Sequence, residues 1–241
     1  MTDIHIYIAH KSYNASSPAI IENFTLNLIK GEFVCLFGQS GCGKTTLLNC
    51  IAGLNTDYQG EICLGENLKN ATIGYVFQNP RLLAWRTVRE NIELVLTKQQ
   101  TACIDELLAV MQLSAVQHQY PKALSQGMQR KVSIIRAFAV NPDILLMDEH
   151  SVALDAPMIR DIRQLLLKLW QQRPHTVLFI THDLREAISL ADRIIFLNAR
   201  PMRIAQEIRV TIQRQQRDNE ILIENFRQQL LNDYPQIQAL L

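Results

Sequence analysis

The chain has 241 residues, of which 48% are apolar and 20% are charged, and its formal net charge at pH 7 is +1. This composition is that of an ordinary globular chain and excludes a disordered one, and the near-zero net charge gives no indication of binding to nucleic acid or to anionic lipid. The five cysteines are odd in number and include no C-x-x-C pair, which predicts reduced thiols in a cytosolic protein. No apolar run reaches the roughly 18 residues of a membrane span, and the N-terminus lacks the pattern of a secretory leader.

Short apolar runs of strand length recur along the chain and are rich in β-branched and aromatic residues. They cover residues 4–8, 33–37, 62–64, 73–77, 144–147, 177–180, 194–197 and 204–210. Helical patterns stand between several of them, at residues 44–52, 126–140, 158–171 and 184–190. Strands that alternate with helices predict an α/β fold with a largely parallel sheet that is covered on both faces.

The section from residue 80 to residue 141 differs, because it shows helical patterns and no convincing strand. Its segments "TVRENIELVL", "ACIDELLAVMQL" and "QGMQRKVSIIRAFAV" predict a helical subdomain inserted into the α/β domain. Residues 211–241 follow as a tail with one amphipathic helix around "NEILIENFRQQLL". We therefore expect a single domain, 1–241, whose α/β core consists of residues 1–79 and 142–210.

The stretch "GQSGCGKT" follows the expected strand 33–37 and fits G-x-x-x-x-G-K-[ST] at every position. In such a loop successive backbone N–H groups turn inward around an anion, and the helix N-terminus adds partial positive charge. Lys44 is expected to reach the β- and γ-phosphates of a nucleotide, and the Thr45 hydroxyl to hold Mg²⁺. The alternative is a glycine-rich turn that binds nothing. The predicted nucleotide-binding residues here are Gly38, Gln39, Ser40, Gly41, Cys42, Gly43, Lys44, Thr45 and Thr46.

The run "ILLMDE" has the pattern of a buried strand that ends in two carboxylates, Asp148 and Glu149. Ligands gather at the carboxyl ends of the strands in a parallel sheet, so Asp148 is expected beside the metal held by Thr45. Glu149 is then placed to polarise a water in line with the γ-phosphate. A lone acidic turn is often only solvated, but this one follows a complete phosphate loop, and the pair predicts hydrolysis.

These motifs resemble the nucleotide-binding subunit of an ATP-binding cassette (ABC) transporter, and the resemblance covers nearly the whole chain. "LSQGMQRK", residues 124–131, is similar to the family signature, and Asp148 with Glu149 is similar to the Walker B pair. "SVALD", which ends at Asp155, resembles the D-loop. Three further positions resemble family residues, namely Gln78 in "YVFQNPRLL", His182 in "ITHDLREA" and Tyr13 in "HKSY".

The resemblance implies a P-loop NTPase fold with a RecA-like, mostly parallel sheet, an antiparallel β part and an inserted α-helical subdomain. It implies that Gln78 contacts Mg²⁺ and the attacking water, that His182 contacts the γ-phosphate, and that Tyr13 stacks on adenine. Taken singly, each has an ordinary alternative: a turn amide, a surface histidine, and a core or edge tyrosine. Asp148 would be a metal ligand, and Asp155 joins the nucleotide-binding set.

In the family, two subunits pack head to tail around two ATP molecules, and the signature of one contacts the γ-phosphate held by the other. The resemblance assigns this role to Ser125, to the Gly127 backbone and to the helix N-terminus at Gln126. It implies ATP and Mg²⁺ as cofactors, a second ATP-binding subunit, a separate integral-membrane permease, a solute-binding protein and no nucleic acid. The two ATP-binding subunits are expected to form a homodimer, and a heterodimer is left open. It also implies a peripheral location on the cytoplasmic side of the plasma membrane.

Three residues depart from the family pattern, and one of them, Met128 in place of the last glutamine of the signature, is familiar in one branch of importer subunits. Gln126 stands where the signature usually has its first glycine, and His150 stands where proline usually follows the catalytic glutamate. If the backbone at Gln126 needs a positive φ or a very close approach to phosphate, its side chain costs about 1–3 kcal/mol. We therefore expect a lower ATPase turnover than with glycine at this position, while the intact Glu149 keeps hydrolysis.

The stretches "VFQNPRLLAWRTVRENI" and "ADRIIFLNARPMRIAQEI" resemble import subunits for nitrate, sulfonate, taurine and related anions, or for thiamine-precursor pyrimidines. In that family a groove after Gln78 receives a coupling helix of the permease. Leu82, Leu83 and Trp85 are expected anchors there, and packing inside the helical subdomain is an equal alternative. Three other classes are alternatives to an import subunit. The neutral charge and the single cassette disfavour a soluble cassette ATPase of DNA repair or translation, and the "LSQGM" and "THD" segments would have no role in a small-molecule P-loop kinase. Gln126 and His150 keep open a regulatory cassette with weak or no hydrolysis.

Overall fold

The computed structural model describes residues 4–14, 17–65, 71–97, 103–149, 156–199 and 201–240. The chain divides into two compact units. The first unit is Met1–Asn70 with Thr176–Leu241, and the second is Ala71–His175. Asp155 and His150, which the sequence motifs single out, lie outside the described residues. The expected division into core, helical subdomain and tail stays a prediction.

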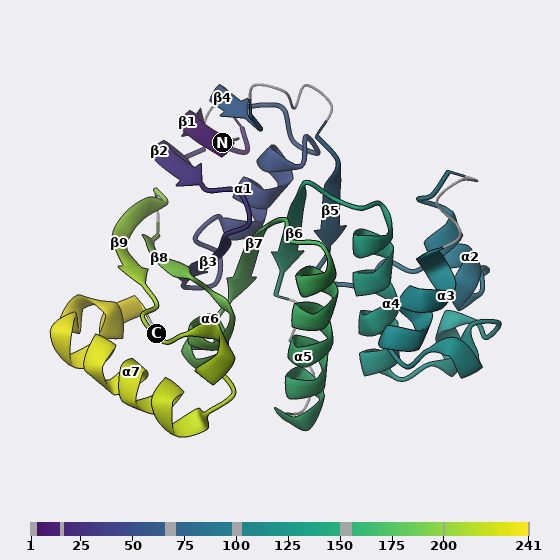
Figure 1. Cartoon of the computed structure of the whole chain (residues 1–241). Coiled ribbons are helices and arrows are strands. Elements are labelled where there is room, and N and C mark those ends of the chain that lie inside the picture. Colours follow the sequence, from purple (N-terminus) through teal and green to yellow (C-terminus); the bar gives the residue numbers. More distant parts are fainter. Residues whose placement is uncertain are drawn as a thin grey trace. The chain divides into compact units, whose positions relative to one another are not determined.

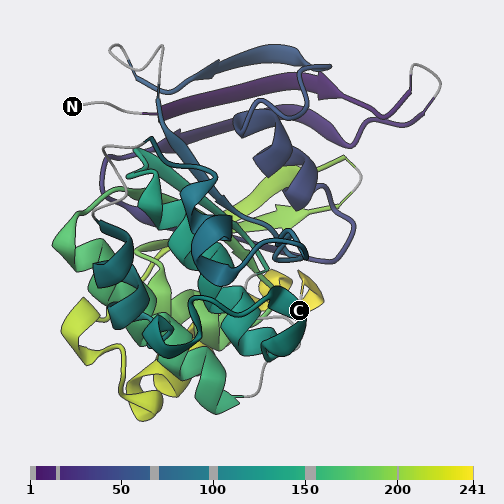
Figure 2. The ribbon, with the colours of Figure 1, turned by 90° about the vertical axis from the view of Figure 1, so that its right-hand side faces the viewer.

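The first unit contains an antiparallel sheet of three strands, seen side by side in Figure 2. In spatial order the strands are β2 (Ile21–Leu28), β1 (Ile4–Lys11) and β4 (Gln59–Cys63). Alternate residues of β1 and β2 are buried, with Ile6 opposite Leu26, which is the period of a sheet with one buried face. The expected antiparallel part is therefore present, and it includes β2, a strand that the apolar runs did not reveal.

A second group of strands in the first unit carries the phosphate loop. The strand β3 (Phe33–Gly38) lies between β7 (Thr176–Thr181) and β8 (Arg193–Asn198) and is parallel to both, while β9 (Arg203–Arg209) is antiparallel to β8. Both β3 and β7 are buried along their whole length, as expected for parallel strands covered on two faces. The described α-helices of this unit are α1 (Lys44–Ile51), α6 (Leu184–Leu190) and α7 (Glu220–Asp233).

The second unit pairs two parallel strands, β5 (Ile73–Val76) and β6 (Ile144–Asp148). The described residues between them in sequence form helices and no strand, in agreement with the helical patterns there. The α-helices among the described residues of this unit are α2 (Val88–Glu93), α3 (Ile104–Val110), α4 (Gln126–Ala139) and α5 (Ala156–Gln172). Helix α4 packs against α2, α3, α5 and β5 (Figure 1). The signature segment therefore runs into the first turns of a helix that has a buried face.

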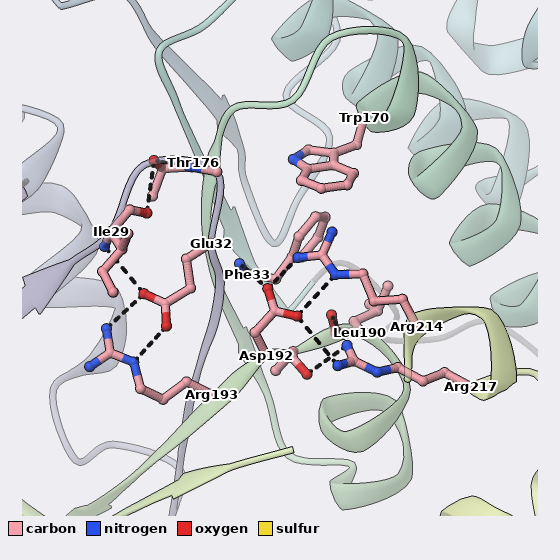
Figure 3. Close-up of polar contacts among 12 residues, drawn as sticks. Ile29, Glu32, Phe33, Trp170, Thr176, Leu190, Asp192, Arg193, Arg214 and Arg217 are labelled. Carbon is pink, nitrogen blue, oxygen red and sulfur yellow. Dashed lines mark hydrogen bonds and ion pairs between the residues drawn. The ribbon is translucent and has the colours of Figure 1, made fainter. Parts of the chain in front are cut away.

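Ion pairs tie the C-terminal part of the first unit to its strands (Figure 3). The Asp192 carboxylate accepts the backbone N–H of Phe33 at 3.0 Å and hydrogen bonds from Arg214 and Arg217. Burial alone raises the pKa of Asp192. The hydrogen bonds from Arg214 and Phe33, together with the charges of the two arginines, outweigh that effect and hold the pKa below its usual range.

We expect Asp192→Asn to lower the free energy of unfolding at pH 7 by about 2 kcal/mol, because two arginines lose a partly buried anion. A carboxyl group with a lowered native pKa stabilises the fold above its unfolded pKa of about 3.9 and loses this contribution as the pH falls through the native value. The difference in the free energy of unfolding between wild type and variant should therefore become smaller below about pH 4. Urea unfolding at pH 7 and pH 3 measures this difference. An equal difference at both pH values would contradict an ionic role for Asp192.

Candidate functional site

The phosphate loop leaves β3 at its carboxyl end and enters α1. Within it, Gly41 and Gly43 have φ angles of 76° and 111°, in the left-handed region that favours glycine. A Cβ atom at Gly43 would lie 2.8 Å from Ile20 Cγ2, so this position also lacks space for a side chain. Gly43 caps α1 without a side-chain hydrogen bond. The loop therefore presents backbone donors at a helix N-terminus, which is the arrangement that binds anions.

The lysine of the motif is held inside this loop. Lys44 is only 5% exposed, and its Nζ donates to the carbonyl oxygens of Gly38 at 2.7 Å and Gln39 at 2.9 Å. The neighbouring Thr45 is exposed on the first turn of α1. The ammonium group and the hydroxyl are thus brought together on the loop and the helix that the sequence predicts to bind phosphate and Mg²⁺.

Tyr13 is 68% exposed, and its hydroxyl lies 3.2 Å from the hydroxyl of Thr46, which is buried in the first turn of α1. The tyrosine is therefore placed beside the phosphate loop within the first unit. Its stacking on adenine stays a prediction.

In the second unit, the carboxyl ends of β5 and β6 bring two expected catalytic residues into contact. Asp148 ends β6 and is 4% exposed. Glu149 follows with a φ of 39°, a left-handed backbone that costs a residue with a side chain about 1–3 kcal/mol. Gln78 donates from Nε2 to Glu149 Oε2 at 3.0 Å. The hydrogen bond gives the Glu149 carboxylate a defined position, as expected of a group that orients a water.

The described residues contain no cluster of three or more histidine, cysteine, aspartate or glutamate side chains that could hold a metal by itself. Mg²⁺ is commonly bound through one or two protein oxygens together with phosphate oxygens and water. Thr45, Gln78 and Asp148 all carry oxygen donors, the ligand type that Mg²⁺ requires. The expected metal ligands are therefore chemically suited to Mg²⁺ bound with a nucleotide.

The signature segment opens helix α4. Ser125 is its N-cap and accepts the backbone N–H of Met128 at 3.3 Å. Gly127 is buried, and a Cβ atom there would overlap the sulfur of Met158 in α5, so the glycine permits close packing of the two helices. Gln126 is the first helical residue and is not among the residues with positive φ. A strained backbone at Gln126 is therefore not found, and the lower turnover expected from this residue stays a prediction.

His182 is exposed at the carboxyl end of β7, in the first unit. The turn that carries it is fixed on both sides. The Thr181 hydroxyl accepts the N–H of Asp183 at 3.0 Å and donates to the buried Glu186 carboxylate, and Asp183 caps α6. Sequence reasoning missed Thr181 and Glu186, although both stand in the same motif "ITHDLREA". Their only signal was their place in this motif, with Thr181 directly before His182 and Glu186 four residues after it.

A glycine-rich loop closed around a buried lysine, together with a buried strand that ends in aspartate and glutamate, defines the class of P-loop nucleoside triphosphatases. A family model described as "ABC transporter" matches residues 21–152. The chain therefore belongs to the ABC transporter family. It is an ATP-binding subunit of this family, and it hydrolyses ATP to drive transport.

Individual relatives agree over most of the chain. The aliphatic sulfonates import ATP-binding protein of Bacillus cereus is 37% identical over 229 residues, which are 92% of this chain and 91% of the relative. The nitrate import ATP-binding protein of Synechococcus elongatus is 36% identical over 86% of this chain and 80% of the relative. These two similarities extend beyond the segment that the family model matches.

A solved ATP-binding cassette, a dimer in a post-hydrolysis state with bound ADP and phosphate, matches this chain with a TM-score of 0.73 and 29% identity. The match covers 88% of this chain and all of that one. It confirms the predicted cassette fold, with a mostly parallel sheet, an antiparallel β part and helices. None of the described helices is both long enough and apolar enough to cross a membrane.

Proposed function

We propose that this chain powers the import of a small anionic solute, of the sulfonate or nitrate type, through a separate membrane permease. The observation that carries the proposal is the near full-length similarity to ATP-binding proteins named for aliphatic sulfonate import and for nitrate import. A solute-binding protein that delivers the anion belongs to the same proposal. The chain would work at the cytoplasmic side of the plasma membrane as a peripheral subunit.

In the proposed reaction, the P-loop backbone and Lys44 bind the phosphates of ATP, and Thr45 binds the accompanying Mg²⁺. Glu149 orients and polarises the attacking water, and His182 contacts the γ-phosphate. The positions of Lys44 and of the Gln78–Glu149 pair support these roles. The remaining proposed contacts are metal coordination by Gln78 and Asp148, adenine stacking by Tyr13 and nucleotide contact by Asp155.

A second copy of the chain is the proposed partner for ATP binding. Ser125 and the Gly127 backbone of each copy would contact the γ-phosphate held by the other, in a head-to-tail homodimer. Two features support this part of the proposal. Ser125 lies at the exposed N-terminus of α4, and a similar cassette is known as a dimer.

The proposed docking site for the permease is a groove on this chain, within the second unit. The groove has a volume of about 340 Å³. Its mostly apolar lining includes Tyr75, Leu83, Leu94, Val95, Ala137 and Val140. Leu94 is 51% exposed, and Trp85, two residues after Leu83, is 72% exposed. These exposures favour anchoring of a partner helix over packing of Trp85 inside the helical section.

One side of the groove is held by hydrogen bonds to a buried side chain. Asn91 is fully buried in α2, accepts the N–H of Leu83 at 2.7 Å and donates to the carbonyl oxygens of Leu83, Arg86 and Thr87. The segment that carries Leu83 and Trp85 is thus fixed, which lowers the entropy that docking would cost.

Purification of the tagged chain from its own membranes tests the proposed function. We expect an integral-membrane permease to co-purify, and we expect ATP hydrolysis by the reconstituted complex to rise when a sulfonate or nitrate and the solute-binding protein are added. A chain that purifies without any membrane subunit would contradict the proposal.

A further inference from the structure

Two arginines of helix α4 hold the backbone of the segment that follows strand β5, all within the second unit. Arg130 donates from Nη1 to the carbonyl oxygen of Phe77 at 2.7 Å and from Nη2 to that of Gln78 at 2.5 Å. Arg136 makes bonds of the same kind, at 2.8 and 3.0 Å, to the carbonyl oxygens of residues 80 and 81. Four backbone carbonyls after β5 are therefore attached to one helix.

The side chain of Arg130 is suited to this task because its guanidinium is a rigid, planar fork that reaches two neighbouring acceptors at once. Arg130 is only 4% exposed. Burial lowers the pKa of its guanidinium, and the nearby charge of Asp148 opposes that effect. The group still stays protonated in a protein, and a buried cation has to be hydrogen-bonded. Its two bonds to the segment after β5 are therefore costly to break.

Gln78 links Arg130 to Glu149, because its backbone contacts Arg130 and its side chain contacts Glu149. Gln78 accepts from Arg130 through its carbonyl oxygen and donates through Nε2 to Glu149 Oε2 at 3.0 Å. Arg130 itself stands five residues after Ser125, the N-cap of α4. A continuous set of contacts thus runs from the signature helix to the carboxylate that is proposed to act on water.

We propose that Arg130 is a positioning residue for ATP hydrolysis, which couples helix α4 to Gln78 and, through the Gln78 side chain, sets the position of Glu149. The inference rests on the role proposed above for Glu149. Because the fork fixes the backbone from which the Gln78 amide extends, a shift of α4 is transmitted to that amide and to its bond with Glu149. Arg130 has no contact with the reacting atoms in this account.

A double-mutant cycle of the purified chain separates this role from simple stabilisation. The variants are Arg130→Gln, Gln78→Ala and the double variant, and kcat, KM for ATP and Tm are measured for each. We expect Arg130→Gln to lower kcat about tenfold, with KM changed less than about twofold. The tenfold figure is the lower end of the loss of about 10- to 100-fold that follows removal of a group that orients a metal ligand. In the Gln78→Ala background the same change should lower kcat less than about twofold, because the amide that Arg130 positions is gone.

The effect of Arg130→Gln on Tm should be equal in both backgrounds, because Gln78→Ala leaves the backbone carbonyls of residues 77 and 78 in place. Arg89→Gln is the matched control. Arg89 donates to Asp105 at 2.5 Å and to Gln117 at 2.7 Å in the same unit. We expect this variant to lower Tm without changing kcat by more than about twofold. If Arg130→Gln does not fold, Arg130→Lys repeats the cycle, since lysine keeps the charge but loses the fork.

An equal loss of kcat from Arg130→Gln with and without the Gln78 amide would overturn the coupling and leave Arg130 a stabilising residue only. Glu149→Gln, measured in the same assay, keeps the two proposals apart. If Glu149→Gln abolishes turnover while the cycle is additive, only the coupling fails. If Glu149→Gln turns over ATP normally, the role proposed for Glu149 fails as well.

Discussion

Lys44→Ala should abolish ATP turnover and weaken ATP binding at least about a hundredfold, which corresponds to roughly 3 kcal/mol. The ammonium group lies inside the phosphate loop, where the carbonyl oxygens of Gly38 and Gln39 hold it. Its charge is therefore positioned before the nucleotide arrives, and charge-assisted bonds to phosphate oxygens are among the strong ones. Calorimetric titration with ATP, together with measurement of phosphate release, checks both effects.

Lys30→Ala is the control for this experiment, because Lys30 is an exposed lysine of the same unit outside the phosphate loop. It should bind and hydrolyse ATP as the wild type does. If Lys44→Ala bound ATP with wild-type affinity, the assignment of this loop as the triphosphate site would be wrong.

Glu149→Gln should lower kcat by about 10² to 10³-fold and leave the affinity for ATP within a few-fold of the wild type, as expected when a general base is lost. Glutamine has nearly the shape of glutamate, so the loss would reflect the missing carboxylate and not a rearranged loop. Single-turnover measurement of phosphate release separates the chemical step from binding.

Glu106→Gln serves as the control, because Glu106 is an exposed carboxylate on α3 of the same unit. Its turnover should match that of the wild type. Unchanged turnover of Glu149→Gln would show that another group activates the water.

The parts of the fold that the sequence predicts well are those with strong local signals. Strand β3 is apolar up to Gly38 and strand β6 is apolar up to Asp148, and both are buried throughout. Strand β2 escaped notice because polar residues interrupt its apolar ones in "IENFTLNL", where only one face is buried. Helices α2 and α3 are shorter than their patterns suggest, because a periodic sequence sets the face of a helix more firmly than its ends.

The residues of the candidate site likewise differ in how well the sequence predicts them. The P-loop motif is contiguous in sequence, so its lysine and glycines could be assigned from eight residues. The bond between Gln78 and Glu149 joins residues 71 apart, and it depends on the parallel pairing of β5 with β6, which a motif does not encode. The attachment of Arg130 to the backbone after β5 depends on how α4 packs, and the sequence alone gave no sign of it.

Mixing two inactive variants tests the central claim, that each of two copies completes the ATP site of the other. Lys44→Ala removes the phosphate-binding lysine, and Ser125→Glu places a negative charge at the N-cap of α4 that should repel the γ-phosphate. Each variant alone should be inactive.

In an equal mixture, half of the dimers contain one copy of each variant, and each such dimer has one site with both Lys44 and Ser125 intact. The account predicts recovery of phosphate release to about a quarter of the wild-type rate. A mixture as inactive as its components would contradict it.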